Sequence, residues 1–195
     1  SGSEEDDGDQ LANGNGTCLQ LQTMPALSLH AAFNPFLESE DQREQEYARL
    51  RRKVATGACA GIWLQIGSDL ALLKEGLEFL ALLDRELAAL PKGAKQEQRP
   101  SAPSLGRGFK HFAVYAGLFL PSKQLLAQQR FRPWAGVKLT AGGYLNSLEE
   151  AKEVTRNLLR IYGDYGVTPL FESKLTKVTQ LQELVAYLDE ASELS

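Results

Sequence analysis

The chain has 195 residues, 43% of them hydrophobic and 24% charged, and its formal net charge is -4. This composition is typical of a soluble globular protein with one core, and the mildly acidic surface provides no overall field that would attract a phosphate backbone. No apolar run reaches the roughly 18 to 20 residues that a membrane helix needs. We therefore expect neither a nucleic-acid partner nor a membrane partner.

The two cysteines, Cys18 and Cys59, have no C-x-x-C spacing and no neighbouring histidine. They indicate neither a metal site nor a disulfide framework, and they favour a reducing, intracellular compartment, either cytoplasm or organelle matrix. The sequence holds two histidines, His30 and His111, which excludes a histidine-rich metal centre. No metal site is predicted.

Composition divides the chain into a tail and a domain. Residues 1–23 are acidic, rich in Gly and Asn, and nearly free of large apolar groups, so burial cannot offset the entropy lost on ordering, and a disordered tail or linker is expected. Residues 24–195 form the expected domain. Within it, residues 92–109 are rich in Lys, Gln, Pro, Ser and Gly, which predicts a mobile insertion.

Four apolar runs of strand length alternate with segments of helical periodicity. The expected strands are residues 26–33, 60–67, 110–120 and 167–173. Because these runs are continuously apolar rather than alternating, they indicate parallel strands buried on both faces. We predict an α/β fold of four βα units, with the helices on one side of a curving sheet or on both sides of an open one; four units equal half of a (β/α)8 barrel.

Capping signals mark where the expected helices begin. Ser39 and Ser147 each stand three residues before Gln or Glu, which is the spacing of a capping box. Asp69 follows the second strand, where a helix cap is a more common role than a catalytic acid. Gly57 and Gly166 end the first and the fourth helical segments.

Ligands of parallel α/β proteins bind at the carboxyl ends of the strands. The polar residues expected there are Asn34, Gln65, Asp69, Ser122, Lys123, Gln124, Glu172, Ser173 and Lys174. Gln65, inside an apolar strand, serves either a ligand or a structural hydrogen bond. Glu172, at the end of the last strand, is a candidate functional carboxylate or the partner of a lysine. No phosphate-binding glycine loop occurs.

The segment RFRPW, residues 130–134, combines two arginines with two aromatic rings. In one interpretation, Arg130 and Arg132, with Lys123 and Lys138 nearby, hold a phosphate or carboxylate while Trp134 offers a stacking face. In the other, Pro133 sets a turn, and Phe131 and Trp134 cover the core edge with the arginine stems lying over them. Both interpretations stay open from the sequence.

Three stretches together resemble the methylenetetrahydrofolate reductase family, a flavin-dependent (β/α)8 barrel of one-carbon metabolism. SLHAAFNP with EYARLRRKVATGACAGIWLQIGSD is similar to strand five, helix five and strand six of that barrel; VYAGLFLPSKQLL is similar to strand seven and YGVTPLFES to strand eight. The resemblance covers residues of about 26 to 177 and implies the C-terminal half of the barrel. Order and spacing agree better than residue identity does.

The resemblance implies roles for particular residues. Gln65, Gln124 and, as a loose substitute, Lys177 correspond to folate contacts, whereas Phe33 and Lys53 correspond to contacts with the flavin, FAD. The resemblance departs from the family pattern at several points: Gln65 lies one residue farther from Lys53, Phe33 replaces a tyrosine, and a nearby histidine is absent.

The catalytic glutamate and the flavin-phosphate segment of the family belong to the half of the barrel that has no counterpart here, so whether this chain is an enzyme stays open. One expectation is an oxidoreductase half that contributes folate and flavin contacts to hydride transfer. The other is a barrel-derived binding or scaffold protein that acts through protein association. In both cases the expected partner is an N-terminal half or a second subunit.

Overall fold

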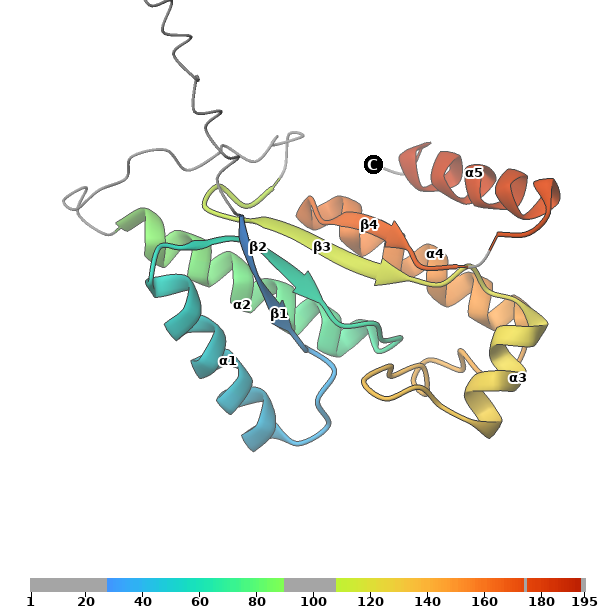
Figure 1. The fold of residues 1–195 in the computed structure, drawn as a ribbon, viewed down its shortest axis with the longest axis horizontal. Helices are drawn as coiled ribbons and strands as arrows, with labels where there is room; N and C mark the ends of the chain where they lie inside the picture. Colours follow the sequence, from blue (N-terminus) through green and yellow to red (C-terminus); the bar gives the residue numbers. More distant parts are fainter. Residues whose placement is uncertain (1–27, 90–107, 174, 194–195) are drawn as a thin grey trace, which may run out of the picture.

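The computed structural model describes residues 28–89, 108–173 and 175–193. Strands and helices alternate along these residues: β1 (Leu29–Phe33), α1 (Glu40–Ala55), β2 (Cys59–Leu64), α2 (Leu70–Ala89), β3 (Ala113–Leu118), α3 (Lys123–Phe131), α4 (Leu148–Tyr165), β4 (Thr168–Phe171) and α5 (Val178–Glu193). The four strands form one sheet in the order β1-β2-β3-β4, and every neighbouring pair is parallel (Figure 1). The predicted α/β fold of four βα units is confirmed.

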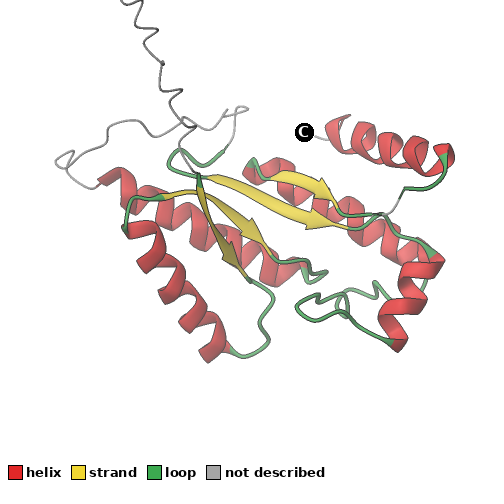
Figure 2. Ribbon diagram, in the orientation of Figure 1, coloured by secondary structure: helices red, strands yellow, loops and turns green. Residues whose placement is uncertain are grey.

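Helices cover one face of this sheet. Strand residues that point to this side are buried, as shown by Phe33 and Ile62, both fully enclosed, and by Val114. The Phe33 ring contacts Tyr47 of α1 and Phe79 of α2, at centroid distances of 5.7 and 5.9 Å. In Figures 1 and 2, α2 and α4 lie behind the sheet and no helix crosses its front. Of the two arrangements left open by the sequence, the described residues adopt the one-sided one.

The strands are shorter than their apolar runs. Residues 119 and 120, for example, are buried although they lie beyond β3. Apolar character reports burial, and burial continues where a chain leaves the sheet to enter a packed loop. The expected tail, residues 1–23, lies outside the described residues, as does most of the expected insertion at 92–109. At the end of that insertion, Phe109 stacks on Phe112.

The helix caps follow the sequence with one exception. Ser147 Oγ accepts a hydrogen bond from Glu150 N at 3.1 Å, and Asp69 Oδ1 accepts from the backbone N–H groups of residues 71 and 72. Gly166 ends α4 with a φ of 67°. The capping box predicted at Ser39 is wrong: Ser39 is the N-cap of α1, but its side chain makes no capping bond. Arg43 instead binds the preceding loop, donating to the carbonyls of residues 37 and 38.

The segment after α3 inserts beside the end of β2. Lys138 pairs with Gly67 in a parallel bridge, with Lys138 N donating to Ile66 O at 3.0 Å and Ser68 N donating to Lys138 O at 2.9 Å. Ser68 Oγ also donates to Ala141 O. Beyond β2, this segment therefore takes the position at which β3 would continue the sheet.

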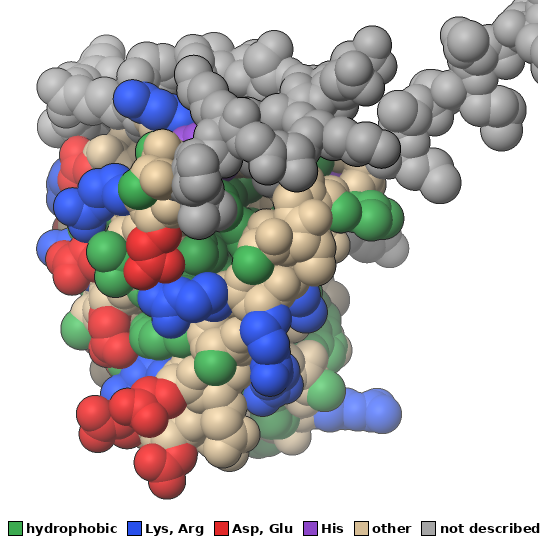
Figure 3. Space-filling view, turned by 90° about the vertical axis from the view of Figure 1, so that its left-hand side faces the viewer, with side chains coloured by type: hydrophobic (Ala, Val, Ile, Leu, Met, Phe, Trp, Pro, Cys, Tyr) green, Lys and Arg blue, Asp and Glu red, His purple; other side chains and the backbone are tan. Residues whose placement is uncertain are grey.

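Surface charges on the α1 side are mixed. Figure 3 views the molecule from this side and shows acidic and basic side chains interspersed. Arg43 pairs with Glu75 at 3.4 Å and Arg51 pairs with Glu86 at 3.2 Å, so α1 and α2 are joined by cross-helix ion pairs. These ion pairs hold the two helices in position relative to each other. They contribute little to the unfolding free energy, because they lie at the surface and are screened by salt.

Candidate ligand-binding face

The front of the sheet carries side chains that no described helix covers. We call this surface the open face; it comprises His30, Ala32, Trp63, Gln65, Tyr115, Thr168, Leu170 and Glu172, which alternate along their strands with the buried residues. Trp63 is 41% exposed although it lies in an inner strand. An inner parallel strand is normally covered on both faces, so an exposed tryptophan at this position marks an unfilled surface.

Three rings form a cluster on the open face. Trp63 stacks on Tyr115 with a centroid distance of 5.0 Å, and His30 stacks on Tyr115 at 5.7 Å. The cluster depends on Gly61, because a Cβ at this position would lie 2.7 Å from His30 Nδ1. The His30 ring therefore lies across the neighbouring strand, and the three rings form one aromatic cluster on the open face.

Ser28 and His30 have the composition of a nucleophile and its base, but their hydrogen bonds exclude that role. Trp63 Nε1 donates to His30 Nδ1 at 2.9 Å, so Nδ1 is the acceptor nitrogen and Nε2 carries the proton. His30 Nε2 then donates to Ser28 Oγ, 3.0 Å away. A base must accept the hydroxyl proton, and the Trp63 bond holds His30 in the opposite tautomer.

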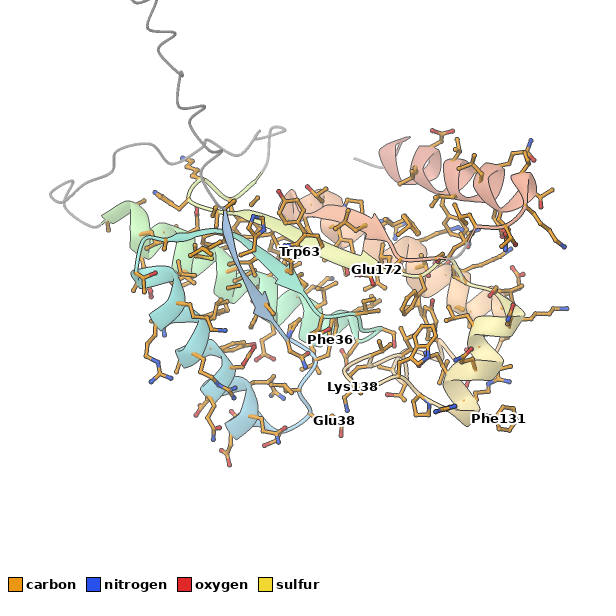
Figure 4. The ribbon with its side chains drawn as sticks, viewed as in Figure 1. Phe36, Glu38, Trp63, Phe131, Lys138 and Glu172 are labelled. Carbon is orange, nitrogen blue, oxygen red and sulfur yellow. The ribbon has the colours of Figure 1, made fainter. Side chains whose placement is uncertain are left out.

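Two polar side chains stand at the carboxyl end of the open face. Glu172 follows β4, and its carboxylate lies over Gly117 of β3, since a Cβ there would be 2.5 Å from Glu172 Oε1. Gln65 follows β2 beside Gly136, where a Cβ would lie 3.7 Å from Gln65 Nε2. Figure 4 marks Glu172 at the end of β4 and Trp63 beside β2 and β3. Both polar groups are exposed, and neither has a side-chain hydrogen-bond partner within the described residues.

Other polar residues at this edge have structural partners. Asn34 Oδ1 accepts from Phe36 N at 3.0 Å, Ser122 Oγ accepts from Leu125 N, and Ser173 Oγ accepts from Leu120 N. Together with the Asp69 cap, these bonds make the turns that leave the strands. The cap that the sequence favoured for Asp69 is confirmed, and Ser122 is the N-cap of α3.

The other two folate candidates, Gln124 and Lys177, and the further candidate Lys123 lie away from the strands. Lys123 and Gln124 occupy the first turn of α3 and are exposed. Lys177 is exposed in the loop before α5, where its backbone N–H donates to Gln180 Oε1 at 3.1 Å. The folate candidate Gln65 and the candidate carboxylate Glu172 are the pair that the strands place on the open face.

The two flavin candidates lie apart from each other and from the open face. The Phe33 side chain is 0% exposed and packs on the helix-covered side of the sheet. Lys53 lies in the last turn of α1, toward the amino ends of the strands, and is exposed. This pair does not assemble a flavin site, so no step of hydride transfer is assigned to these two residues.

The RFRPW segment divides into residues with different roles. The Trp134 ring meets Phe119 edge-to-face at 5.3 Å, and Trp134 N donates to Gln129 Oε1, in agreement with a core lid. Phe131 is 88% exposed and covers nothing, so that part of the lid interpretation is wrong. Arg130 donates to the carbonyls of residues 145 and 146, whereas Arg132 is exposed. Figure 4 shows Phe131 at the far end of α3 from the open face.

Within the described residues, His, Cys, Asp and Glu side chains do not gather in groups of three or more that would hold a metal ion. None of the helices described combines the length and the apolar character that a bilayer crossing requires. The His111 ring, the second histidine, pairs with Asp84 at 3.0 Å, and Asp84 also accepts from the backbone N–H groups of residues 110 and 111. This network ties α2 to the start of β3.

Fold and site together define an α/β protein of parallel βα units with one uncovered sheet face. No family model matches the chain, and comparisons with curated proteins and with solved structures also found no match. The comparisons therefore assign the chain to no family.

Sequence reasoning missed the aromatic cluster. A signal was present, because His30, Trp63 and Tyr115 are ring side chains that stand among mostly small or aliphatic residues in their strands. Their meeting depends on strand register, in which Trp63 pairs with Tyr115 and His30 pairs with Gly61. Register was not available from the separate strand patterns.

Proposed function

We propose that this chain provides one half of a (β/α)8 barrel similar to methylenetetrahydrofolate reductase. We propose further that the function of this half is to bind a planar folate-type ligand on the open face. The observation that carries the proposal is that the aromatic cluster with exposed Trp63 shares the open face with Gln65 and Glu172, which have no side-chain hydrogen-bond partner in the described chain. Aromatic rings together with a few polar groups are typical of ligand sites at strand ends.

Each group has a part in this binding. Trp63 and Tyr115 would stack on the heterocycle, while the Glu172 carboxylate accepts from its N–H groups and the Gln65 amide donates to a ring acceptor. FAD, Lys177 and Gln124 remain predictions from the family resemblance. The oxidoreductase activity of the whole barrel requires the acid and the flavin-phosphate segment that the resemblance assigns to the other half.

Tryptophan fluorescence tests this proposal. The chain has two tryptophans, so Trp134→Phe leaves Trp63 as the single reporter. Folic acid should then quench its emission in a saturable way, and Glu172→Gln should raise the Kd by about tenfold through loss of charge-assisted hydrogen bonds. Glu86→Gln, which makes the same chemical change on α2, is the matched control and should leave the Kd unchanged. Quenching without saturation, or equal Kd values for the two variants, contradicts the proposal.

A second candidate function is a non-catalytic binding or scaffold protein. It is favoured by the His30 tautomer, which prevents Ser28 activation. In this alternative the open face binds protein rather than a small ligand. Absence of folate binding together with stable self-association would favour it over the first.

A further inference from the structure

The sheet has two free edges, and the surface beside one of them is apolar. β1 and β4 are the outer strands of the order β1-β2-β3-β4. Next to β4, helix α5 exposes an apolar stripe in which Val178 is 72%, Leu181 51%, Val185 47% and Leu188 40% exposed. These positions recur every three or four residues and so lie on one face of the helix. The other face of α5 packs on α4, where Tyr187 is 5% exposed.

A matching apolar position lies at the other edge. Leu29, the first residue of β1, is 59% exposed, and no described strand or helix lies on the outer side of β1. In a (βα) repeat, the helix after one strand covers the groove between this strand and the next. Within the described residues, the α5 stripe and Leu29 therefore lie at the two outer edges of the sheet without a neighbouring element.

Charge distribution along the two outer helices is complementary. The last two turns of α1 hold Arg49, Arg51, Arg52 and Lys53 and no acidic residue. Helix α5 holds four acidic residues and no basic one; of these charges, Glu183 already pairs with Lys152 of α4 at 3.2 Å, as Arg51 of α1 pairs with Glu86 of α2. Both helices run back toward the amino ends of the strands (Figure 1), so α5 laid beside an α1 of another copy would place opposite charges at the same level.

We propose that a second copy of this chain docks head to tail on the first, with the β4–α5 surface of each copy against the β1–α1 surface of the other. A rotation of 180° closes such a contact after two copies, and eight parallel strands result. The α5 stripe then covers Leu29 of the partner copy, and the two open faces meet inside the closed barrel. This inference rests on the half-barrel part of the proposed function, but not on folate binding.

Hydrogen bonds between β4 of one copy and β1 of the other contribute a small part of the contact. Glu172 N donates to Leu118 O, so the backbone N–H and C=O groups of even-numbered residues in β4 point toward β3. The backbone groups of Pro169 and Phe171 therefore point toward the free edge. Pro169 has no N–H to donate, which leaves Phe171 N as the outward donor of β4. Most of the attraction therefore comes from the helix surfaces, and substitutions on α5 are expected to dissociate the pair.

Sedimentation of the full chain tests the assembly. We expect a dimer whose Kd rises with salt, because the α1–α5 contact pairs opposite charges. Leu181→Asp with Val185→Asp should raise the Kd by roughly 100-fold or more, while both positions are exposed enough to leave the monomer folded. Leu82→Asp, at an exposed leucine of α2, is the matched control and should remain dimeric. A monomer at all concentrations overturns the proposal.

Cross-linking distinguishes the head-to-tail contact from a symmetric pairing of two α5 helices. On a Cys18→Ser background, Arg52→Cys and Leu188→Cys are prepared as separate chains with tags of different size. A short bismaleimide should join the two chains in the mixture and should join neither variant to itself. Self-linking of Leu188→Cys overturns the proposed arrangement. A dimer that does not bind folic acid would contradict the proposed ligand alone, and a monomer that binds it would contradict the dimer alone.

Discussion

Gly67 shows how a single residue sets the shape of the carboxyl edge. The Phe36 ring, 2% exposed, lies flat against the Gly67 backbone, and a Cβ there would be 2.6 Å from Phe36 Cδ1. Gly67 also forms the bridge to Lys138. The absence of a side chain thus lets the loop after β1 and the segment after α3 approach the end of β2 from opposite sides.

Gly67→Ala is expected to destabilise the protein. The new methyl group would push a buried ring out of a packed core, which typically costs about 1 to 3 kcal/mol of unfolding free energy. Gly108→Ala is the matched control, since its nearest neighbour to a new Cβ is 3.8 Å away and the change should be neutral or slightly stabilising. Urea unfolding of both variants measures the difference. Equal midpoints would mean that Phe36 moves without cost.

Helix α4 has its two ends set by local capping residues and its position set by packing against other elements. It begins at the Ser147 cap, ends at Gly166 in the left-handed conformation, and buries one side, including Ala151, Leu158 and Tyr162, against the sheet and α5. Helix α1 begins at Ser39 without a side-chain cap and is instead held by Arg43. The two helices therefore depend on their first residues to different degrees.

Ser147→Ala should cost about 1 kcal/mol of unfolding free energy, because the N–H of Glu150 loses its acceptor at the helix start. Ser39→Ala removes a hydroxyl that makes no capping bond and should change the unfolding free energy by a few tenths of a kcal/mol at most. Thermal unfolding of the two variants side by side measures this contrast. A larger loss for Ser39→Ala would contradict the assigned caps.

Buried tyrosines in the core make the folding stability of the molecule depend on pH in the alkaline range. Burial raises the pKa of Tyr144 to about 12 and raises the pKa of Tyr162 further above the usual value near 10. In the unfolded chain both tyrosines ionise near pH 10, whereas in the folded protein they keep their protons. Folding stability is therefore complete below about pH 10 and falls as the pH rises toward the folded pKa values.

As the pH rises from about 10 to about 12, the unfolding free energy should fall by about 2 to 3 kcal/mol for each of these tyrosines, because each ionises more readily in the unfolded chain. Tyr144→Phe should flatten the loss, because phenylalanine has no proton to release. Denaturant midpoints measured at several pH values in this window, for the parent chain and the variant, test the claim. An unchanged pH slope in Tyr144→Phe would show that other groups govern alkaline unfolding.

The open face also decides what the molecule can do as a whole. When a second copy covers the open face, the aromatic cluster lies in the interior of a barrel. Without a second copy, Trp63 is 41% exposed in an inner strand of the sheet. The stability of the assembly and the accessibility of the ligand face are therefore linked. Ligand binding and self-association are expected to change together in variants of α5.

The sequence by itself determined the order and type of the elements, because apolar runs, caps such as Ser147 and Asp69, and terminators such as Gly166 act through neighbours along the chain. It also placed Gln65 and Glu172 at strand ends correctly. The side of the sheet on which Phe33 packs followed instead from tertiary contacts with α1, the next helix along the chain, and with the more distant α2.

Only the tertiary structure decided which candidates share a surface. Strand register brought His30 over Gly61, and the approach of β4 to β3 brought Glu172 over Gly117, in both cases because a glycine leaves room for a side chain from the adjacent strand. The same packing enclosed Phe33 on the helix-covered side and placed Lys53 near the amino ends of the strands, away from the carboxyl edge that holds Gln65 and Glu172. Local patterns report what each segment becomes; contacts between segments, which depend on register and on the space beside each backbone, decide which residues meet.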